Sequence, residues 1–293
     1  MNIFKSPKFS AFIEEKAKPF LVKQKKELAK NTNIVIELVK RGIKLQYRNS
    51  AIGVIWTILN PLLNMFVMYI VFGTILKYNN DKTYLLYLLC GNIIFNTMRG
   101  ATSQSLTSLV YNRGLLTKNK IAYNVFPLAC NLSAIVNFLF SFIALIVVML
   151  IVSIQVPVFS RMIWLTIPML PALFLFNYGM SLILSALYVF FRDVMHFYNV
   201  FLTLWMYFTP IFYKLKNLGS LWQEIVMKLV MKLNPMAHFV EYFRDIIYRV
   251  KIGTLHEATV DTSLITLYII GLSFAIVGTL VFSITKRKFI FSI

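Results

Sequence analysis

Acidic residues are scarce in this sequence, which holds 11 Asp and Glu against 30 Lys and Arg in 293 residues. Charged residues together make up only 14% of the chain, whereas soluble globular proteins carry about 25%. Hydrophobic residues reach 58% instead. This balance excludes an ordinary soluble domain and predicts an integral membrane protein.

The sequence also lacks the residue patterns of common catalytic and nucleotide-binding sites. None of its 11 glycines begins a GxxxxGK(S/T) phosphate-binding loop, and the HExxH and GxSxG motifs are absent. Cys90 and Cys130 form no CxxC pair, and the three histidines, His196, His238 and His256, lie far apart. We therefore expect no catalytic residue, no metal site and no cofactor in this chain, and predict that it is not an enzyme.

Long runs without a charged residue divide the chain. There are six of them: 49–76, 83–98, 121–160, 162–191, 194–213 and 262–285. Most reach the roughly 17–25 residues that a membrane-spanning helix needs, and the short 83–98 run is expected to continue past Arg99 as a helix leaving the membrane. The absence of charge inside these runs argues against proton- or sodium-coupled transport. We predict an all-α membrane protein with a cytoplasmic amphipathic arm (1–48) and a six-helix transmembrane domain (49–293).

The placement of Lys and Arg predicts the orientation of the chain. One side of the predicted membrane holds 20 Lys and Arg against 5 acids, and the other side holds 10 against 6. Because positively charged loops stay in the cytoplasm, both termini are expected to be cytoplasmic. The positive excess then records topology and attraction to anionic membrane lipids, so we expect no nucleic acid partner.

The cytoplasmic arm carries an apolar stripe at helical spacing. Its members are Ile34, Val35, Leu38, Val39 and Ile43, with Lys40, Arg41 and Lys44 on other faces. This pattern is typical of a helix that lies in the plane of the membrane surface. Anchoring to the membrane and docking to a partner protein both fit the pattern.

The cytoplasmic loop over 99–124 contains a second short amphipathic pattern. Leu106, Leu109 and Val110 follow helical spacing, and Gly114 interrupts the pattern before Leu115 and Leu116. A short helix of this kind can lie in a groove of another protein. An ordinary basic loop that obeys the positive-inside rule also explains the composition. The residues that we assign to docking are Leu106, Leu109, Val110, Tyr111, Arg113, Leu115 and Leu116.

The external segment over 214–261 holds two amphipathic helical patterns. Asn234 and Pro235 separate them, because a proline disfavours helix at the residue before it. Neither pattern is long enough to span a bilayer, so the segment is predicted to form a re-entrant hairpin before the last helix. Glu241 and Arg244 lie three residues apart on one face and are expected to pair.

Polar and aromatic residues stand out within two of the apolar runs. Asn60, Pro61 and Asn64 interrupt the first run, whereas Trp205, Tyr207 and Phe208 enrich the fifth; Tyr69 lies in the outer half of the first. Aromatic belts at the membrane–water boundary explain part of this enrichment. The remaining rings are candidates for lining a conduit for sugars.

These motifs together resemble a known family. Tyr47-Arg48-Asn49-Ser50 with Gly53, Trp56 and Asn60-Pro61 opens the first helix, Phe191-Arg192-Asp193 follows the fourth, and Asn234-Pro235 with Glu241 and Arg244 marks the external hairpin. The order of motifs resembles the transmembrane subunits of polysaccharide ABC exporters. These ABC-type-2 permeases move O-antigen, capsule, wall teichoic acid and related lipid-linked glycans. The resemblance covers about residues 30–293.

The resemblance implies a homodimer in the bacterial cytoplasmic membrane, bound to two copies of a separate ATPase that holds ATP and Mg. It also implies a channel at the dimer interface, lined by the first and fifth helices, and a coupling helix in the 99–124 loop. We expect Arg48 to meet either a lipid diphosphate of the substrate or the headgroups of the membrane. The expected path residues are Arg48, Trp56, Asn60, Asn64, Tyr69, Trp205, Tyr207 and Phe208.

Three other functions remain open from the sequence. An ABC-type-2 permease for drugs or small lipids would share the topology. A membrane-embedded glycosyltransferase or acyltransferase would need acidic or His groups, of which the loops offer only the scattered Asp81, Asp193 and His196. A non-transporting scaffold would use the basic loops to recruit a partner.

Overall fold

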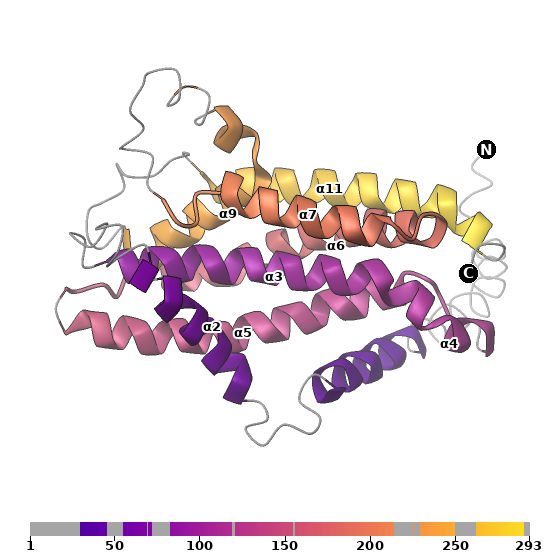
Figure 1. The fold of residues 1–293 in the computed structure, drawn as a ribbon, viewed down its shortest axis with the longest axis horizontal. Coiled ribbons are helices and arrows are strands. Elements are labelled where there is room, and N and C mark those ends of the chain that lie inside the picture. Colours follow the sequence, from indigo (N-terminus) through magenta and orange to yellow (C-terminus); the bar gives the residue numbers. More distant parts are fainter. Residues whose placement is uncertain are drawn as a thin grey trace, which may run out of the picture.

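In the computed structural model, the chain is a bundle of long helices (Figure 1). The structure describes residues 30–45, 55–68, 70–71, 83–118, 121–154, 156–213, 225, 229–249 and 262–289, and this part holds no strand. Arg48 and Tyr69 lie outside the described residues, as does most of the first half of the external hairpin. The all-α prediction is therefore confirmed for the described part of the chain.

The elements follow one another along the chain with these bounds. A helix covers residues 30–45. It is followed by α2 (Ile55–Met68), α3 (Tyr84–Tyr111), α4 (Arg113–Lys118), α5 (Val125–Ser153), η3 (Arg161–Leu165), α6 (Thr166–Phe190), α7 (Val194–Phe208), α9 (Pro235–Arg244), the π-helical η5 (Asp245–Arg249), α11 (Leu264–Thr285) and η7 (Lys286–Lys288). α3 packs against both α5 and α6, and α11 packs along α6.

Three of the described helices are long and apolar enough to cross a membrane. They are Val125–Ser153, Met162–Phe190 and Leu264–Thr285. These spans agree with the third, fourth and sixth charge-free runs of the sequence. The count of six spans stays a prediction, because α2, α3 and α7 are shorter or more polar in their described parts.

α3 continues past Arg99, as predicted, and its helix extends to Tyr111. Its 28 residues correspond to about 42 Å at 1.5 Å per residue. The hydroxyl groups of Thr102 and Ser105 donate to the carbonyls of Met98 and Ala101, at 2.8 and 2.6 Å. Because these polar side chains bond within their own helix, the polar segment does not end it. Much of the expected 99–124 loop is therefore helix.

α6 and α11 cross at a contact between two glycines. A Cβ atom added to Gly278 would collide with the backbone of Gly179, and one added to Gly271 would lie 2.6 Å from the carbonyl oxygen of Ala172. Small residues of this kind let two membrane helices approach until their backbones touch. This close contact positions α11 against the core that α3 and α6 share.

The 30–45 helix packs its apolar stripe on the first turns of α5. Val35 is buried with Val125 and Ala129, and Ile34, Leu38 and Val39 pack around them. The helical spacing of the stripe is confirmed, but its expected use is corrected: the stripe contacts the chain's own α5 and not the membrane or a partner protein. Lys40 and Lys44, on the other faces of this helix, are exposed.

Candidate functional site

The described part of the segment predicted to form an external hairpin, called the hairpin below, is joined to the end of α7 through Asn234. This residue caps α9, because its side-chain oxygen accepts from the backbone N–H of Met236 at 3.0 Å, and Pro235 follows at the first helical position. The same oxygen accepts from the indole N–H of Trp205 at 2.7 Å. The amide nitrogen of Asn234 donates to the hydroxyl of Thr209 at 3.0 Å. One side chain therefore joins two segments of the molecule.

A cluster of buried charges lies at the centre of the hairpin. Glu241 accepts from Arg244 at 2.7 Å and also from Arg249, and all three side chains are almost completely buried. Arg249 in turn contacts Asp245 at 3.2 Å. The pairing of Glu241 with Arg244 was predicted from their spacing and is confirmed.

The cluster is anchored on Tyr87 of α3. Arg244 donates two hydrogen bonds to the carbonyl oxygen of Tyr87, at 3.2 and 3.0 Å. Its guanidinium carbon lies 3.4 Å from the centre of the Tyr87 ring, a cation–π contact. Gly91 permits this approach, since a Cβ atom there would lie 2.9 Å from the guanidinium. Charge, hydrogen bonds and ring contact together fix the hairpin to α3.

The surrounding charges set the ionisation of the two carboxyls differently. Burial favours the neutral form of Glu241, but Arg244 and Arg249 outweigh it and hold the pKa of this carboxyl below its ordinary value. Burial dominates at Asp245 and raises the pKa of that carboxyl to about 6, although Arg249 opposes the shift. The satisfied Glu241–Arg244–Arg249 network is a structural clamp.

The sequence missed Asp245, Arg249 and Tyr87 as members of the clamp. Arg249 is eight residues from Glu241, and the α-helical repeat places residues at that separation on one face, but two turns apart. The π-helical segment η5 carries Arg249 back to Glu241. Tyr87 lies 157 residues from Arg244 along the chain, so no local pattern connects them.

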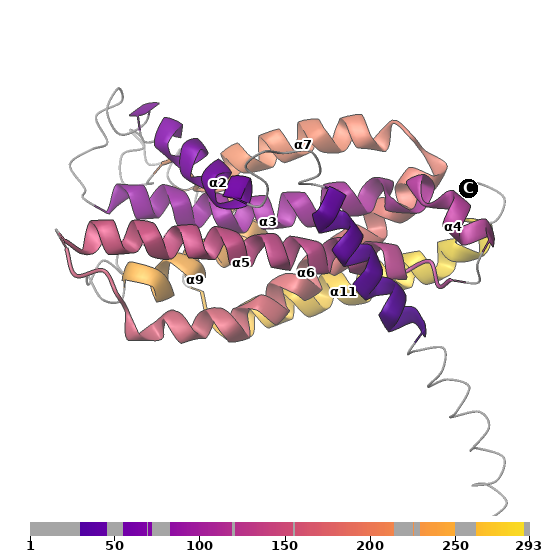
Figure 2. The same cartoon turned by 90° about the horizontal axis from the view of Figure 1, so that it is seen from below.

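A second candidate region is the face formed by α2, α3 and α7. In Figure 1, α2 lies below α3 and α7 lies above it. In Figure 2, the view from below, α2 and α7 both lie at the upper edge of the bundle, above α3. On α2, Trp56, Asn60 and Asn64 are exposed, and Asn64 donates to the side chain of Asn60 at 3.1 Å. On α7, Tyr207 and Phe208 are exposed. We call this surface the α2–α3–α7 face.

Trp205 differs from its two aromatic neighbours because it is half-buried. Its ring makes edge contacts with Phe95 and Phe176 of the core, and its indole N–H is bonded to Asn234. The structure therefore gives Trp205 a packing role between α7 and α9. Of the expected residues in the fifth charge-free run, Tyr207 and Phe208 contribute most to the exposed surface.

α3 adds a polar stripe to this face that the sequence did not reveal. Asn92, Asn96, Arg99 and Ser103 recur at helical spacing and are exposed or half-buried, and Asn96 donates to Asn92 at 2.8 Å. Arg99 lies 15 residues after the start of α3 at Tyr84, about 22 Å along the helix. The search for charge-free runs could not reveal Arg99 as part of this stripe, because a charged residue ends such a run, and the 83–98 run stops directly before it.

The guanidinium of Arg99 is incompletely satisfied. One terminal nitrogen donates weakly to the sulfur of Met206 at 3.5 Å, and the group lies 5.4 Å from the centre of the Phe95 ring. Its buried Nε has no hydrogen-bond partner among the described residues. Among the described residues no carboxylate pairs with this guanidinium, which is therefore well suited to an incoming anion.

The residues assigned to docking separate into two groups. Leu106 and Leu109 are buried in the core, so they do not belong to an exposed surface. Tyr111 is 74% exposed and Arg113 is also exposed, while Leu115 and Leu116 pack partly against the core from α4. Val110 is half-buried as well. The accessible part of this region is the end of α3 together with α4.

Comparison with known proteins places the chain in a family. The profile of the ABC-2 type transporter family matches residues 34–248, which is more than half of the chain. The chain belongs to the ABC-2 type transporter family. Together with the three apolar helices, this membership makes it a multi-pass membrane protein and a transport component, and the family implies partnership with an ABC ATPase subunit.

Similar proteins carry the name of an export permease. The O-antigen export system permease protein RfbA of Myxococcus xanthus is 29% identical over 230 residues, covering 78% of this chain and 85% of the relative. A protein of the same name from Klebsiella pneumoniae is 27% identical over 269 residues, covering 92% and 98%. A second one from that organism is 27% identical over 270 residues. This ABC-2 type transporter chain is thus similar to O-antigen export permeases over most of its length.

Proposed function

We propose that this chain is the membrane-spanning subunit of an ATP-driven exporter that moves a lipid-linked polysaccharide across the bacterial cytoplasmic membrane. In this proposal α2, α3 and α7 complete six spans with α5, α6 and α11, and both termini are cytoplasmic. The similarity to O-antigen export permeases supports the substrate class. A glycan of the O-antigen, capsule or teichoic-acid type fits the proposal.

The observation that carries the proposal is the polar α2–α3–α7 face. Asn60, Asn64, Asn96 and Arg99 are exposed or half-buried on α2 and α3, which the proposal places in the membrane. Polar side chains facing lipid are costly, because hydrocarbon offers them no hydrogen bonds. A second copy of the chain would cover this face, and a two-fold axis would join the two faces around one water-filled path.

The chemistry of the face suits a glycan with a phosphorylated lipid carrier. Asparagine side chains can bond sugar hydroxyls through both a donor and an acceptor. The exposed Trp56 and Tyr207 present flat rings with polar edges to sugars. Arg99, and Arg48 outside the described residues, would contact the phosphate groups of the carrier.

The ATPase would bind at the end of the bundle that carries α4. Tyr111, Arg113 and the partly exposed Leu115 and Leu116 form the accessible surface there. ATP and Mg would be held by that partner, two copies of which would serve a homodimer. Closure of the ATPase pair would then shift the channel between states.

Export by reconstituted complexes tests the proposal. The chain and its ATPase are placed in vesicles with lipid-linked glycan, and ATP-dependent movement of the glycan is measured. Asn60→Leu should lower this movement on the order of tenfold, since it removes a polar contact from the path. Ser273→Leu, an exposed polar residue of α11 outside the α2–α3–α7 face, is the matched control and should transport normally.

The dimer is tested separately by cross-linking. In a variant without Cys90 and Cys130, a cysteine introduced for Thr203 on the exposed side of α7 should link two copies of the chain. The same replacement at Ser273 should not. Normal transport by Asn60→Leu, combined with no cross-link at position 203, would leave a scaffold or another transport geometry as the better account.

A further inference from the structure

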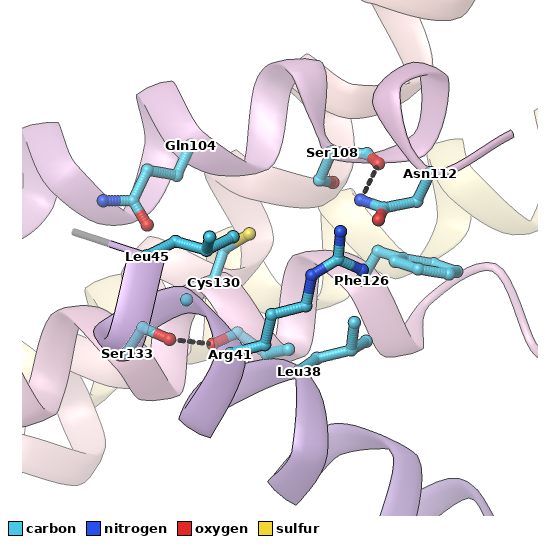
Figure 3. Close-up of a pocket in the computed structure, with 11 residues that line it drawn as sticks. Leu38, Arg41, Leu45, Gln104, Ser108, Asn112, Phe126, Cys130 and Ser133 are labelled. Atoms are coloured by element: carbon cyan, nitrogen blue, oxygen red, sulfur yellow. Dashed lines mark hydrogen bonds between the residues drawn. The ribbon is translucent and has the colours of Figure 1, made fainter. Parts of the chain in front are cut away.

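A separate cavity lies between the 30–45 helix and the ends of α3 and α5 (Figure 3). Its volume is about 190 Å³. The 30–45 helix contributes Leu38, Arg41, Gly42 and Leu45 to its lining. α3 contributes Gln104 and Ser108, Asn112 follows its last residue, and the first turns of α5 complete the wall. None of these residues belongs to the α2–α3–α7 face.

The cavity carries positive charge and hydrogen-bond donors. Arg41 extends from the 30–45 helix toward Asn112 and Phe126 (Figure 3). None of the eleven described residues that line the cavity is Asp or Glu. Glu37, the acid of this helix, is paired with Lys40 at 3.0 Å. The guanidinium of Arg41 therefore faces the cavity without a carboxylate in its wall.

The amide groups beside Arg41 add further donors. The side-chain nitrogen of Asn112 donates one hydrogen bond to the carbonyl oxygen of Ser108, at 2.8 Å. An amide nitrogen carries a second N–H that can donate to a ligand. The side chain of Gln104 is exposed at the other end of the α3 segment. An arginine flanked by amide donors is an arrangement that recognises phosphate oxygens.

The position of the cavity indicates a membrane amphiphile. Its α3 residues lie in the last turns of that helix and its α5 residues in the first, so the cavity opens at one end of the bundle. Leu38, Leu45 and Phe126 add apolar surface to the wall. The volume is below the roughly 300–1,000 Å³ of sites that enclose a whole small molecule. A headgroup would fit while its chains remain in the bilayer.

We propose that this cavity binds the phosphate headgroup of a membrane amphiphile, with Arg41 as its charged contact. Basic pockets between membrane helices are known to hold anionic headgroups. A phospholipid and a polyprenyl phosphate present the same phosphate chemistry, and the experiment separates them. This inference needs only the membrane location of the chain and is independent of the proposed glycan.

Binding to the purified full-length chain tests the proposal. The delipidated chain in detergent is titrated with dioleoylphosphatidylglycerol or with a long-chain polyprenyl phosphate, and bound molecules are counted by native mass spectrometry. Arg41→Gln should weaken binding of at least one probe by about tenfold or more, the effect of losing a charged hydrogen bond. Lys44→Gln, on the same helix but outside the cavity, is the matched control and should bind as the wild type does.

A second variant tests the cavity without changing its charge. Gly42 lines the wall, and a Cβ atom there would lie 3.6 Å from the hydroxyl of Ser133, so Gly42→Leu adds a side chain at that wall without a backbone clash. It should also weaken binding, while helix content by circular dichroism stays unchanged.

Each outcome decides the proposal. Loss of phosphatidylglycerol alone identifies a phospholipid site, loss of the polyprenyl phosphate alone identifies a polyprenyl phosphate site, and loss of both identifies a general phosphate site. Wild-type binding of both probes by Arg41→Gln, or equal loss in Lys44→Gln, overturns the proposal. Because no ATP, ATPase or glycan is present, these results do not depend on whether the chain is an exporter.

Discussion

The indole N–H of Trp205 and the side-chain oxygen of Asn234 form a 2.7 Å hydrogen bond across 29 residues of sequence. The bond joins the last turn of α7 to the first turn of α9. The helix α7, most of whose side chains are exposed, is therefore tied to a buried part of the hairpin.

Replacing Asn234 by alanine should release both segments. Asn234→Ala removes the cap of α9 and leaves the buried N–H of Trp205 without its acceptor, at a combined cost of about 2 kcal/mol or more. Thermal unfolding in detergent measures the loss, and Trp205 fluorescence should move to longer wavelength as water reaches the ring. Asn234→Asp retains the acceptor and should keep the fluorescence of the wild type. Identical spectra for Asn234→Ala and the wild type would contradict this role.

Removing the charge of Glu241 should destabilise the clamp. Glu241→Gln leaves Arg244 and Arg249 buried without their shared carboxylate, which costs about 3–5 kcal/mol for a buried pair. Glu37→Gln is the matched control, because Glu37 forms an ion pair with Lys40 at the surface, and the two are also three residues apart. That exposed pair contributes at most about 1 kcal/mol. Equal unfolding temperatures for the two variants would show that the buried cluster adds nothing.

The contact between α6 and α11 should not tolerate a single methyl group. Gly278→Ala forces a Cβ atom into the backbone of Gly179, and the helices must separate at a cost of more than about 3 kcal/mol. Gly100→Ala makes the same change inside α3, where nothing lies within 4 Å. That control should gain about 0.5–1 kcal/mol of helix stability. Yield of folded protein and unfolding temperature distinguish the two, and a normal yield for Gly278→Ala would refute the close crossing.

Stability should depend on pH through Asp245. Burial raises the pKa of its carboxyl to about 6 from 3.8, so the folded state holds this proton more tightly than the unfolded state does. The contribution of Asp245 to stability therefore falls as the pH rises from about 4 through about 6. Asp245→Asn stays neutral, so its stability relative to the wild type should increase over that interval. Asp193→Asn, an exposed carboxyl before α7, is the control, and a pH-independent difference for Asp245→Asn would contradict the shift.

The end of α3 should affect binding of the ATPase. Tyr111→Ala removes a ring that is 74% exposed beside α4, and co-purification of the ATPase with the chain should fall on the order of tenfold. Trp164→Ala removes a ring that is 73% exposed in η3, on another part of the surface, and should leave co-purification unchanged. The opposite ranking would place the ATPase elsewhere.

Patterns within one helix were readable from the sequence. The spacing of Ile34, Val35, Leu38 and Val39 correctly predicts one apolar helix face, although this face packs on α5 and not on the membrane or a partner. Glu241 and Arg244 pair because three residues bring two side chains to one face of a helix. Long apolar runs likewise predicted α5, α6 and α11, because the hydropathy of a segment depends only on its own residues and not on the helices it contacts.

Contacts between distant segments were not readable. Leu106 and Leu109 have the spacing of an amphipathic docking helix, but the helix is covered by α5 and α6, so they are core residues. Trp205 packs against Phe95 and Phe176, which its position in the sequence did not show, and its place in the path stays a prediction. In each case the packing of the residue is determined by neighbours on another helix. The spacing of residues along one helix cannot predict such contacts.

The unbroken course of α3 has a mechanical consequence. Tyr87, which holds the hairpin through Arg244, lies near its start, and Tyr111, beside α4, is its last residue. No hinge separates them among the described residues, and a packed α-helix resists both stretching and bending. In the proposed exporter, a displacement applied at the α4 end would therefore reach Tyr87 and the hairpin through movement of α3 as one rigid unit.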